Sequence, residues 1–258
     1  MNNIIAVVNQ KGGVGKTTSV INIASGLVKK NKKVLVIDID PQANATTGSG
    51  VEKNQLIHSV YDVILGNISI SEGVLQSKSG GFDILPANRN LAGAEIELVD
   101  LSEREIRLKK ALAKISNQYD FILIDCPPSL SLLTLNGLSA SNYLLVPIQC
   151  EYYALEGLTD LLNTINRLKT SGLNSKIELL GIVRTMFDQR NNLANQVSMQ
   201  LEQHFGNKVF KTHIPRNVRL AEAPSFGMPA INLDLEASGS QAYMALVKEL
   251  IKKMSVTR

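Results

Sequence analysis

The sequence contains no tryptophan, only two cysteines and no long apolar run. A membrane-spanning helix needs about 18 or more consecutive apolar residues, so we expect none. Cys126 and Cys150 lack the CxxC spacing of metal and redox motifs, and we expect two free, buried thiols. The first residues, MNNIIAVVN, lack the basic start and small-residue cleavage site of a secretory signal. We therefore expect a cytoplasmic protein.

What is present is typical of a globular chain: 258 residues, of which 44% are hydrophobic and 19% charged. No linker rich in proline, glycine or serine divides the sequence, so we expect residues 1–258 to form a single domain. The net charge of +4 is a weak indication of an anionic partner.

Apolar segments of strand length alternate with longer helical patterns. The predicted strands are 4–8, 34–39, 82–85, 121–124, 143–148 and 177–183. The predicted helices are 17–30, 91–115, 156–169, 192–205 and 240–254, with short helices near 59–65 and 71–75. Continuously apolar strands that alternate with helices indicate an α/β fold with a doubly wound, mostly parallel sheet. In such folds ligands bind beyond the carboxyl ends of the strands.

The first predicted strand leads directly into a glycine-rich segment and then a helix, which is the context of a phosphate-binding P-loop. The segment supplies Lys11, Gly12, Gly13, Val14, Gly15, Lys16, Thr17 and Thr18. Backbone N–H groups of such a loop point at phosphate oxygens, and the helix N-terminus adds partial positive charge. We expect Lys16 to reach the β and γ phosphates of ATP and the Thr17 hydroxyl to bind Mg²⁺.

Three aspartates stand at the ends of predicted strands. Asp38 and Asp40 end the second strand, where a carboxylate can face Mg²⁺ or the attacking water. Asp125 follows four apolar residues, a Walker B pattern, and we expect it to hold Mg²⁺ through a water molecule. We predict that Asp38 supports the environment of the metal.

The loop departs from the standard pattern, because Gln10 stands where glycine is usual and Lys11 follows it. The string KGGVGKTT therefore resembles the deviant Walker A motif of the ParA/MinD family of ATPases. This resemblance implies an ATP-bound homodimer in which Lys11 reaches the partner's nucleotide. It also implies that Asp40 is the hydrolysis residue, so the catalytic set is Lys11, Lys16 and Asp40.

Three strings extend the resemblance over nearly the whole chain: VLVIDIDPQANATTG, FILIDCPPS and IPRNVRLAEAPSFGMPAI. The last is similar to the ParA branch, also called Soj-like, and implies that Pro215 and Asn217 contact the adenine. The branch resemblance further implies non-specific binding of double-stranded DNA, a ParB-like centromere-binding partner and association with the nucleoid. Arg190 and Arg219 match the positions best associated with DNA binding in that branch.

The region from Arg184 to Arg219 carries six lysines and arginines against two acids. Few aromatic residues interleave, so we expect contacts to DNA phosphates; a solvated basic face is the alternative. The last helix has one apolar face, which fits a helix docked on the sheet or, in a MinD-like division-site ATPase, one lying on a membrane. We favour docking and expect no stable membrane association. An ATPase that carries an iron–sulfur cluster would need paired cluster cysteines, and Cys126 is not placed like one.

Overall fold

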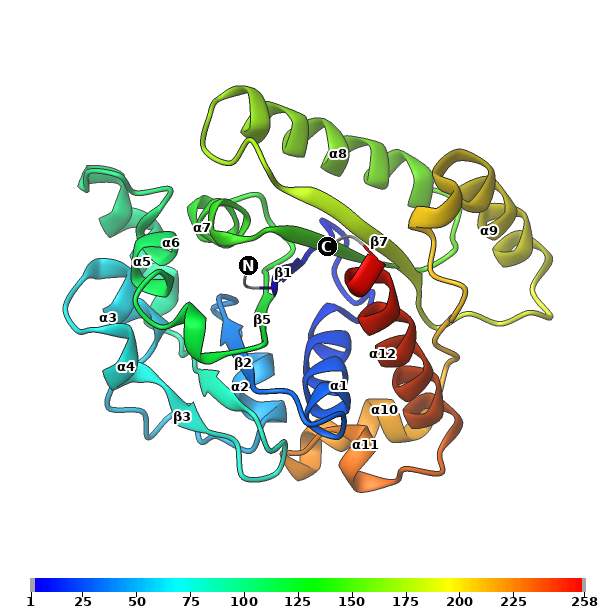
Figure 1. The fold of residues 1–258 in the computed structure, drawn as a ribbon, viewed down its shortest axis with the longest axis horizontal. Coiled ribbons are helices and arrows are strands. Elements are labelled where there is room, and N and C mark those ends of the chain that lie inside the picture. Colours follow the sequence, from blue (N-terminus) through cyan, green and yellow to red (C-terminus); the bar gives the residue numbers. More distant parts are fainter. Residues whose placement is uncertain (1–2, 257–258) are drawn as a thin grey trace.

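A seven-stranded sheet forms the centre of the protein, seen here in a computed structural model that describes residues 3–256 (Figure 1). The strand order is β3-β4-β2-β5-β1-β6-β7, and every pairing is parallel except that of β3 with β4. The strands are β1 (Asn3–Val7), β2 (Val34–Asp38), β3 (Leu75–Gln76), β4 (Asp83–Leu85), β5 (Phe121–Asp125), β6 (Tyr143–Ile148) and β7 (Glu178–Arg184). This confirms the predicted mostly parallel α/β sheet.

Helices cover both faces of the sheet, and Figure 1 shows α8 and α12 on opposite sides of it. The helices are α1 (Lys16–Val28), α2 (Asn44–Gly48), α3 (Val60–Leu65), α4 (Ile70–Gly73), α5 (Leu91–Glu97), α6 (Arg107–Leu112), α7 (Leu132–Ala140), α8 (Ala154–Thr170), α9 (Asn192–Phe205), α10 (Val218–Glu222), α11 (Ala230–Leu233) and α12 (Ser238–Val256). Within residues 3–256, no helix is long and apolar enough to span a bilayer.

The central strand β1 shows why the sheet is buried on both sides. Ile5 and Val7 join the core that includes α1 and α12, whereas Ile4 and Ala6 join the core on the opposite face. Successive side chains of a strand point to opposite faces, so a strand between two helical layers must be apolar throughout.

The last helix, α12, docks on α1 through its apolar face, as predicted. Tyr243, Leu246 and Leu250 are buried there. The helices approach so closely at Gly26 that a Cβ atom added to it would lie 2.8 Å from a methyl carbon of Val247. The apolar face of α12 is therefore occupied by the protein's own core.

The predicted helix over 91–115 is wrong, because the chain breaks into α5, a short 3₁₀ turn and α6. Glu103 takes a left-handed backbone conformation with φ of 55° between them. After the break, the Arg107 guanidinium donates to the carbonyl oxygens of Ile64 and Leu65, the latter at 2.8 Å. Those carbonyl groups are at the C-terminus of α3 and have no partner within that helix, so Arg107 of α6 stabilises the end of α3.

The predicted short helix over 71–75 is also misplaced. Helix α4 covers Ile70–Gly73, and Leu75 begins the short edge strand β3. Helix α4 starts one residue earlier than expected, because Ser69 forms a capping box in which its N–H donates to the Glu72 carboxylate at 2.8 Å.

Candidate nucleotide-binding site

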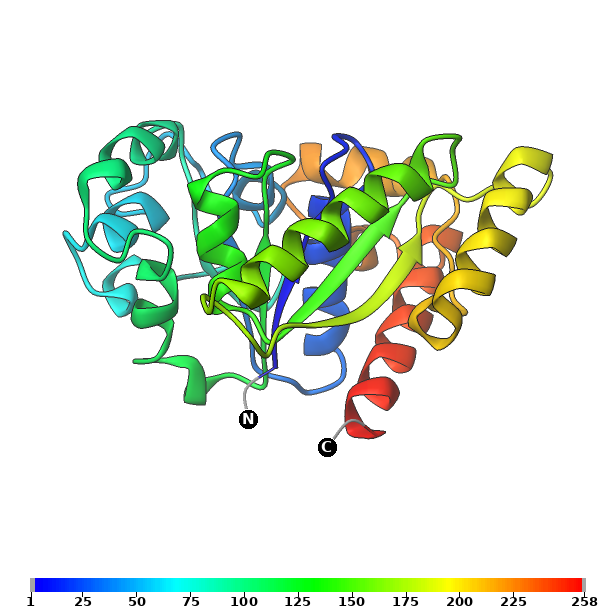
Figure 2. The same ribbon diagram turned by 90° about the horizontal axis from the view of Figure 1, so that it is seen from above.

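The loop between β1 and α1 has the backbone shape that phosphate binding requires. Gly13 and Gly15 have φ values of +74° and +87°, a region that other residues adopt only with strain. Gly15 immediately precedes α1, so the first N–H groups of that helix face the loop. Figure 2 shows this loop at the edge of the sheet opposite the last turn of α12.

Lys16 is buried, and its ammonium points back into the loop. Nζ donates to the carbonyl oxygens of Asn9 at 3.0 Å and Lys11 at 3.1 Å. Burial lowers the pKa of this ammonium, and the negative charge of Asp125 acts in the opposite direction. The Lys16 ammonium therefore lies inside the loop, where phosphate oxygens of a nucleotide could replace the two carbonyl oxygens as its partners.

Thr17 and Asp125 meet beside the loop, where β5 ends next to β1. The Thr17 hydroxyl donates to Asp125 Oδ2 at 2.7 Å, while the buried Oδ1 of Asp125 has no hydrogen-bond partner among the described residues. Burial, followed by the charge of Asp38, raises the pKa of Asp125 well above its usual range. An orphaned carboxylate oxygen next to a threonine hydroxyl fits Mg²⁺ and its water shell.

Asp38 and Asp40 are close in sequence but differ in surroundings. Asp38 is fully buried, and its oxygens accept bonds from Asp40 N at 3.1 Å and from Thr46 N and Oγ1, both at 2.8 Å. Asp40 lines the open cavity, and its Oδ1 accepts from Gln42 N at 2.9 Å. Asp38 therefore orders the turn that presents Asp40, and it does not face the cavity itself.

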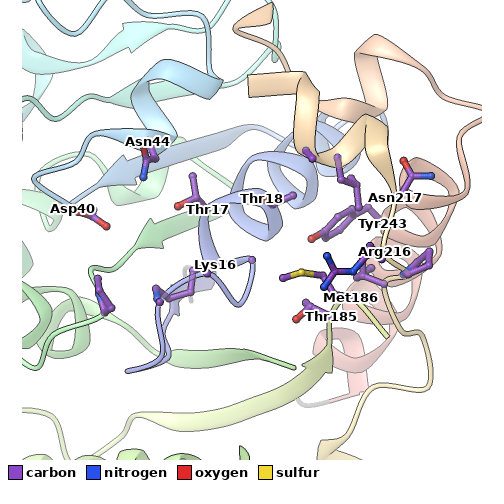
Figure 3. Close-up of a pocket in the computed structure, with 18 of the residues that line it drawn as sticks. Lys16, Thr17, Thr18, Asp40, Asn44, Thr185, Met186, Arg216, Asn217 and Tyr243 are labelled. Atoms are coloured by element: carbon purple, nitrogen blue, oxygen red, sulfur yellow. The ribbon is translucent and has the colours of Figure 1, made fainter. Parts of the chain in front are cut away.

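A cavity of about 490 Å³ extends from the loop toward the last third of the chain. Lys16, Thr17 and Asp40 line one end, and Met186, Arg216 and Tyr243 line the other (Figure 3). The volume is in the usual range of small-molecule sites. The cavity fits a nucleotide with its phosphates on the loop and its base at the far end.

Pro215 and Asn217, the residues predicted to contact adenine, both line the far end. The Asn217 side chain is already engaged: Oδ1 accepts from Arg219 N at 2.9 Å and caps α10, while Nδ2 donates to Ser238 Oγ at 3.0 Å. Asn217 thus shapes the pocket by holding α10 to the start of α12.

Several lining residues were missed from the sequence. They are Gln42, Asn44, Pro128, Thr185, Met186, Ile214, Arg216, Leu220, Ala221 and Tyr243. Two of them, distant in the sequence, hold the phosphate loop and α1 in place. Thr185 Oγ1 donates to Val14 O at 2.8 Å, and Tyr243 Oη bonds with Ser19 Oγ at 3.0 Å. Thr185, Met186 and Tyr243 lie outside the three family strings, and only the folded chain brings them to the loop. The other residues of this list lie within those strings but were given no role.

Lys11 lies on the exposed outer side of the loop. Its ammonium pairs with the Glu151 carboxylate, just before α8, and both side chains are about half exposed, at 53% and 54%. Directly after Glu151, the rings of Tyr152 and Tyr153 are exposed and meet edge to face. The Lys11 side chain is thus paired with Glu151 and does not line the cavity.

The six basic residues between Arg184 and Arg219 do not all lie on the surface. Arg184 is buried, and its guanidinium donates to Ser198 Oγ, Glu202 Oε1 and the Phe210 carbonyl. Arg190 is exposed and pairs with Asp188, which lowers the pKa of that carboxyl to about 2. Arg219 pairs with Glu222 and Asp234. Counting Arg184 toward a basic surface was wrong.

Comparisons with known proteins place these features in a family. Residues 2–179 match an AAA domain. The chain is 49% identical to the sporulation initiation inhibitor protein Soj of Bacillus subtilis, over 97% of this chain and 98% of that protein. It is 46% identical to the chromosome partitioning protein ParA of Caulobacter vibrioides, over 97% and 94%.

The fold is also shared with a solved structure that contains a nucleotide and magnesium. The cobyrinic acid a,c-diamide synthase of Mycobacterium smegmatis, crystallised with ADP and magnesium, is 35% identical with a TM-score of 0.87 and covers 100% of this chain and 97% of its own. The same protein has also been crystallised with an ATP analogue and magnesium. The chain is an ATPase that uses ATP and Mg²⁺, and it belongs to the ParA/Soj family of P-loop ATPases.

Proposed function

We propose that this ATPase segregates chromosomes or plasmids by an ATP-driven cycle of dimerisation and DNA binding. Two ATP-bound protomers pair face to face, and the dimer binds double-stranded DNA of the nucleoid without sequence preference. A ParB-like centromere-binding protein stimulates hydrolysis, and the ADP-bound protomers separate and release the DNA. The observation that carries this proposal is the exposed, outward-directed Lys11 at the rim of an otherwise complete phosphate site.

The residues divide the chemical work as follows. Lys16 exchanges its two loop carbonyls for β and γ phosphate oxygens, which supplies the charge that binds the triphosphate. Thr17 and Asp125 hold Mg²⁺, which would neutralise developing charge on the phosphates. Asp40 stands in the cavity near the γ-phosphate position and orients the attacking water.

The missing element of this site is a positive charge on the side of the γ-phosphate that faces solvent. Lys11 of a second protomer would supply it, as an arginine finger does in trans, an effect worth about 10³–10⁵ in rate. Hydrolysis would then require the dimer, so that the nucleotide state controls assembly.

The DNA-binding part of the proposal rests on Arg190 and Arg219. Arg190 lies in the loop that follows β7, and Arg219 lies in α10, which lines the nucleotide cavity through Leu220. The partner of Arg190 is an exposed carboxylate and those of Arg219 are half-buried; we propose that DNA phosphates replace them. Phosphate contacts carry no sequence information, so binding should be non-specific.

The MinD-type alternative places the last helix on a membrane, whereas here the apolar face of α12 is buried against α1. The decisive experiment measures binding to duplex DNA and to anionic liposomes in one buffer, with ATP, ADP or no nucleotide. We expect binding to DNA only with ATP and no liposome binding. An ATP-loaded dimer that binds liposomes and ignores DNA at low salt would replace partition with the MinD-type function.

A further inference from the structure

The base end of the nucleotide cavity contains a single charged side chain, Arg216. Among the described residues that line the cavity, Lys16 and Asp40 are also charged, but both lie at the phosphate end. Figure 3 shows Arg216 beside Met186 and Tyr243, well away from Asp40.

The guanidinium of Arg216 makes no hydrogen bond or ion pair with any residue in the described range 3–256. Its neighbours in the sequence differ: the guanidinium groups of Arg184, Arg190 and Arg219 are all bonded to carboxylates. Of these four arginines, Arg216 therefore has the guanidinium group that is available to a ligand.

The backbone on either side of Arg216 is held to β7 and the loop after it by hydrogen bonds. Phe187 N donates to Ile214 O at 3.0 Å, and Ile214 N donates to Arg184 O at 2.8 Å. Phe187 and Pro215 also form an isolated β-bridge. The loop is thus tied to the end of β7, so the guanidinium can reach the base without ordering the backbone first.

The other polar side chain of this loop is not available to the base, because both ends of the Asn217 amide are bonded within the protein. Of the remaining neighbours, Met186 and Leu220 are apolar, and the Tyr243 hydroxyl is already bonded to Ser19 Oγ. An arginine in the plane of the base would donate to O6 and N7 of guanine and would meet the amino group of adenine. A guanidinium group that lies above the ring is attracted to the π-electrons of any base.

We propose that Arg216 stacks its guanidinium on the nucleobase of bound ATP and is a nucleobase-binding residue of this enzyme. The contact is a cation–π interaction that holds the nucleoside half of the ligand. This inference concerns nucleotide binding alone and is independent of the DNA cycle.

The test compares the dissociation constants of ATP, GTP and inorganic tripolyphosphate for wild type and Arg216→Ala, by calorimetry. We expect ATP and GTP to bind about 2- to 30-fold more weakly to the variant, to similar extents. Tripolyphosphate, which has no base, should bind equally to both proteins. Arg167→Ala, which removes an exposed arginine on α8, is the matched control and should change none of the three.

Three results would overturn the proposal. Equal weakening of tripolyphosphate and ATP would mean that Arg216 contacts phosphates. A much larger loss for GTP than for ATP would mean that it contacts the base edge. Unchanged ATP affinity in an Arg216→Ala variant with a wild-type melting temperature would mean that it contacts no part of the nucleotide.

Discussion

The Thr17 hydroxyl donates to Asp125 Oδ2 at 2.7 Å, and this bond joins the start of α1 to the end of β5. Both groups are proposed to hold Mg²⁺, Asp125 through a water molecule, and the bond keeps them together at that site. Thr17→Val keeps the shape and removes the oxygen. We expect the variant to bind ATP at least about tenfold more weakly in the presence of Mg²⁺. Titration in EDTA is the control, because without the metal the two proteins should bind ATP equally; an equal loss under both conditions would contradict the metal role.

In the proposed dimer, Glu151 would compete with the phosphates of the partner's nucleotide for Lys11. An ion pair between half-exposed groups is worth about 0.2–1 kcal/mol, and it must open before Lys11 can reach across a dimer. Glu151→Gln should therefore form the ATP dimer at a protein concentration about two- to fivefold lower. The advantage should shrink as salt increases, because salt screens the exposed pair.

Analytical ultracentrifugation with a non-hydrolysed ATP analogue measures this shift. Glu156→Gln, an exposed glutamate in the first turn of α8, is the matched control. If both variants dimerise like wild type while Lys11→Ala fails to, the cis pair has no inhibitory role and the trans role of Lys11 stands.

Asp38 gives a pH dependence of stability. Full burial raises the pKa of the Asp38 carboxyl from 3.8 to about 6. Between these two pH values the folded protein therefore keeps a proton that the unfolded chain has released. The stability contributed by this group is therefore complete below about pH 4 and is lost as the pH rises to about 6. Relative to Asp38→Asn, wild type should lose about 2 kcal/mol between pH 4 and pH 7 in urea denaturation without nucleotide. Parallel pH profiles of the two proteins would show that Asp38 does not titrate here.

Arg219 should act on DNA through charge alone. Arg219→Ala should weaken ATP-dependent binding equally on unrelated duplexes and flatten the log–log salt slope by about one for each phosphate that the arginine no longer neutralises. ATP affinity and dimerisation should not change. Fluorescence anisotropy at several salt concentrations measures the slope, with Lys114→Ala, an exposed lysine beyond α6, as the control. A loss confined to one DNA sequence would indicate base contacts.

The sequence predicted the phosphate loop and the strand-end aspartates because their chemistry is local: a short segment supplies the glycines, the lysine and the helix start. The base end was predicted only in part: the segment with Pro215 and Asn217 was identified, but Met186 and Tyr243 come from distant elements. The pairing of Lys11 with Glu151 spans 140 residues and has no signal in either segment. The break between α5 and α6 depends on Arg107 meeting the end of α3, which helical periodicity does not encode.

The central claim is that each nucleotide is hydrolysed by Asp40 of its own protomer and Lys11 of the partner. Lys11→Ala and Asp40→Ala proteins, each nearly inactive alone, should be mixed in equal amounts before ATP is added. In a mixed dimer one site then has both residues intact, so random pairing should restore about a quarter of the wild-type ATPase rate. If the mixture forms mixed dimers in the ultracentrifuge but stays as inactive as its two components, Lys11 acts within its own protomer and the shared active site is refuted.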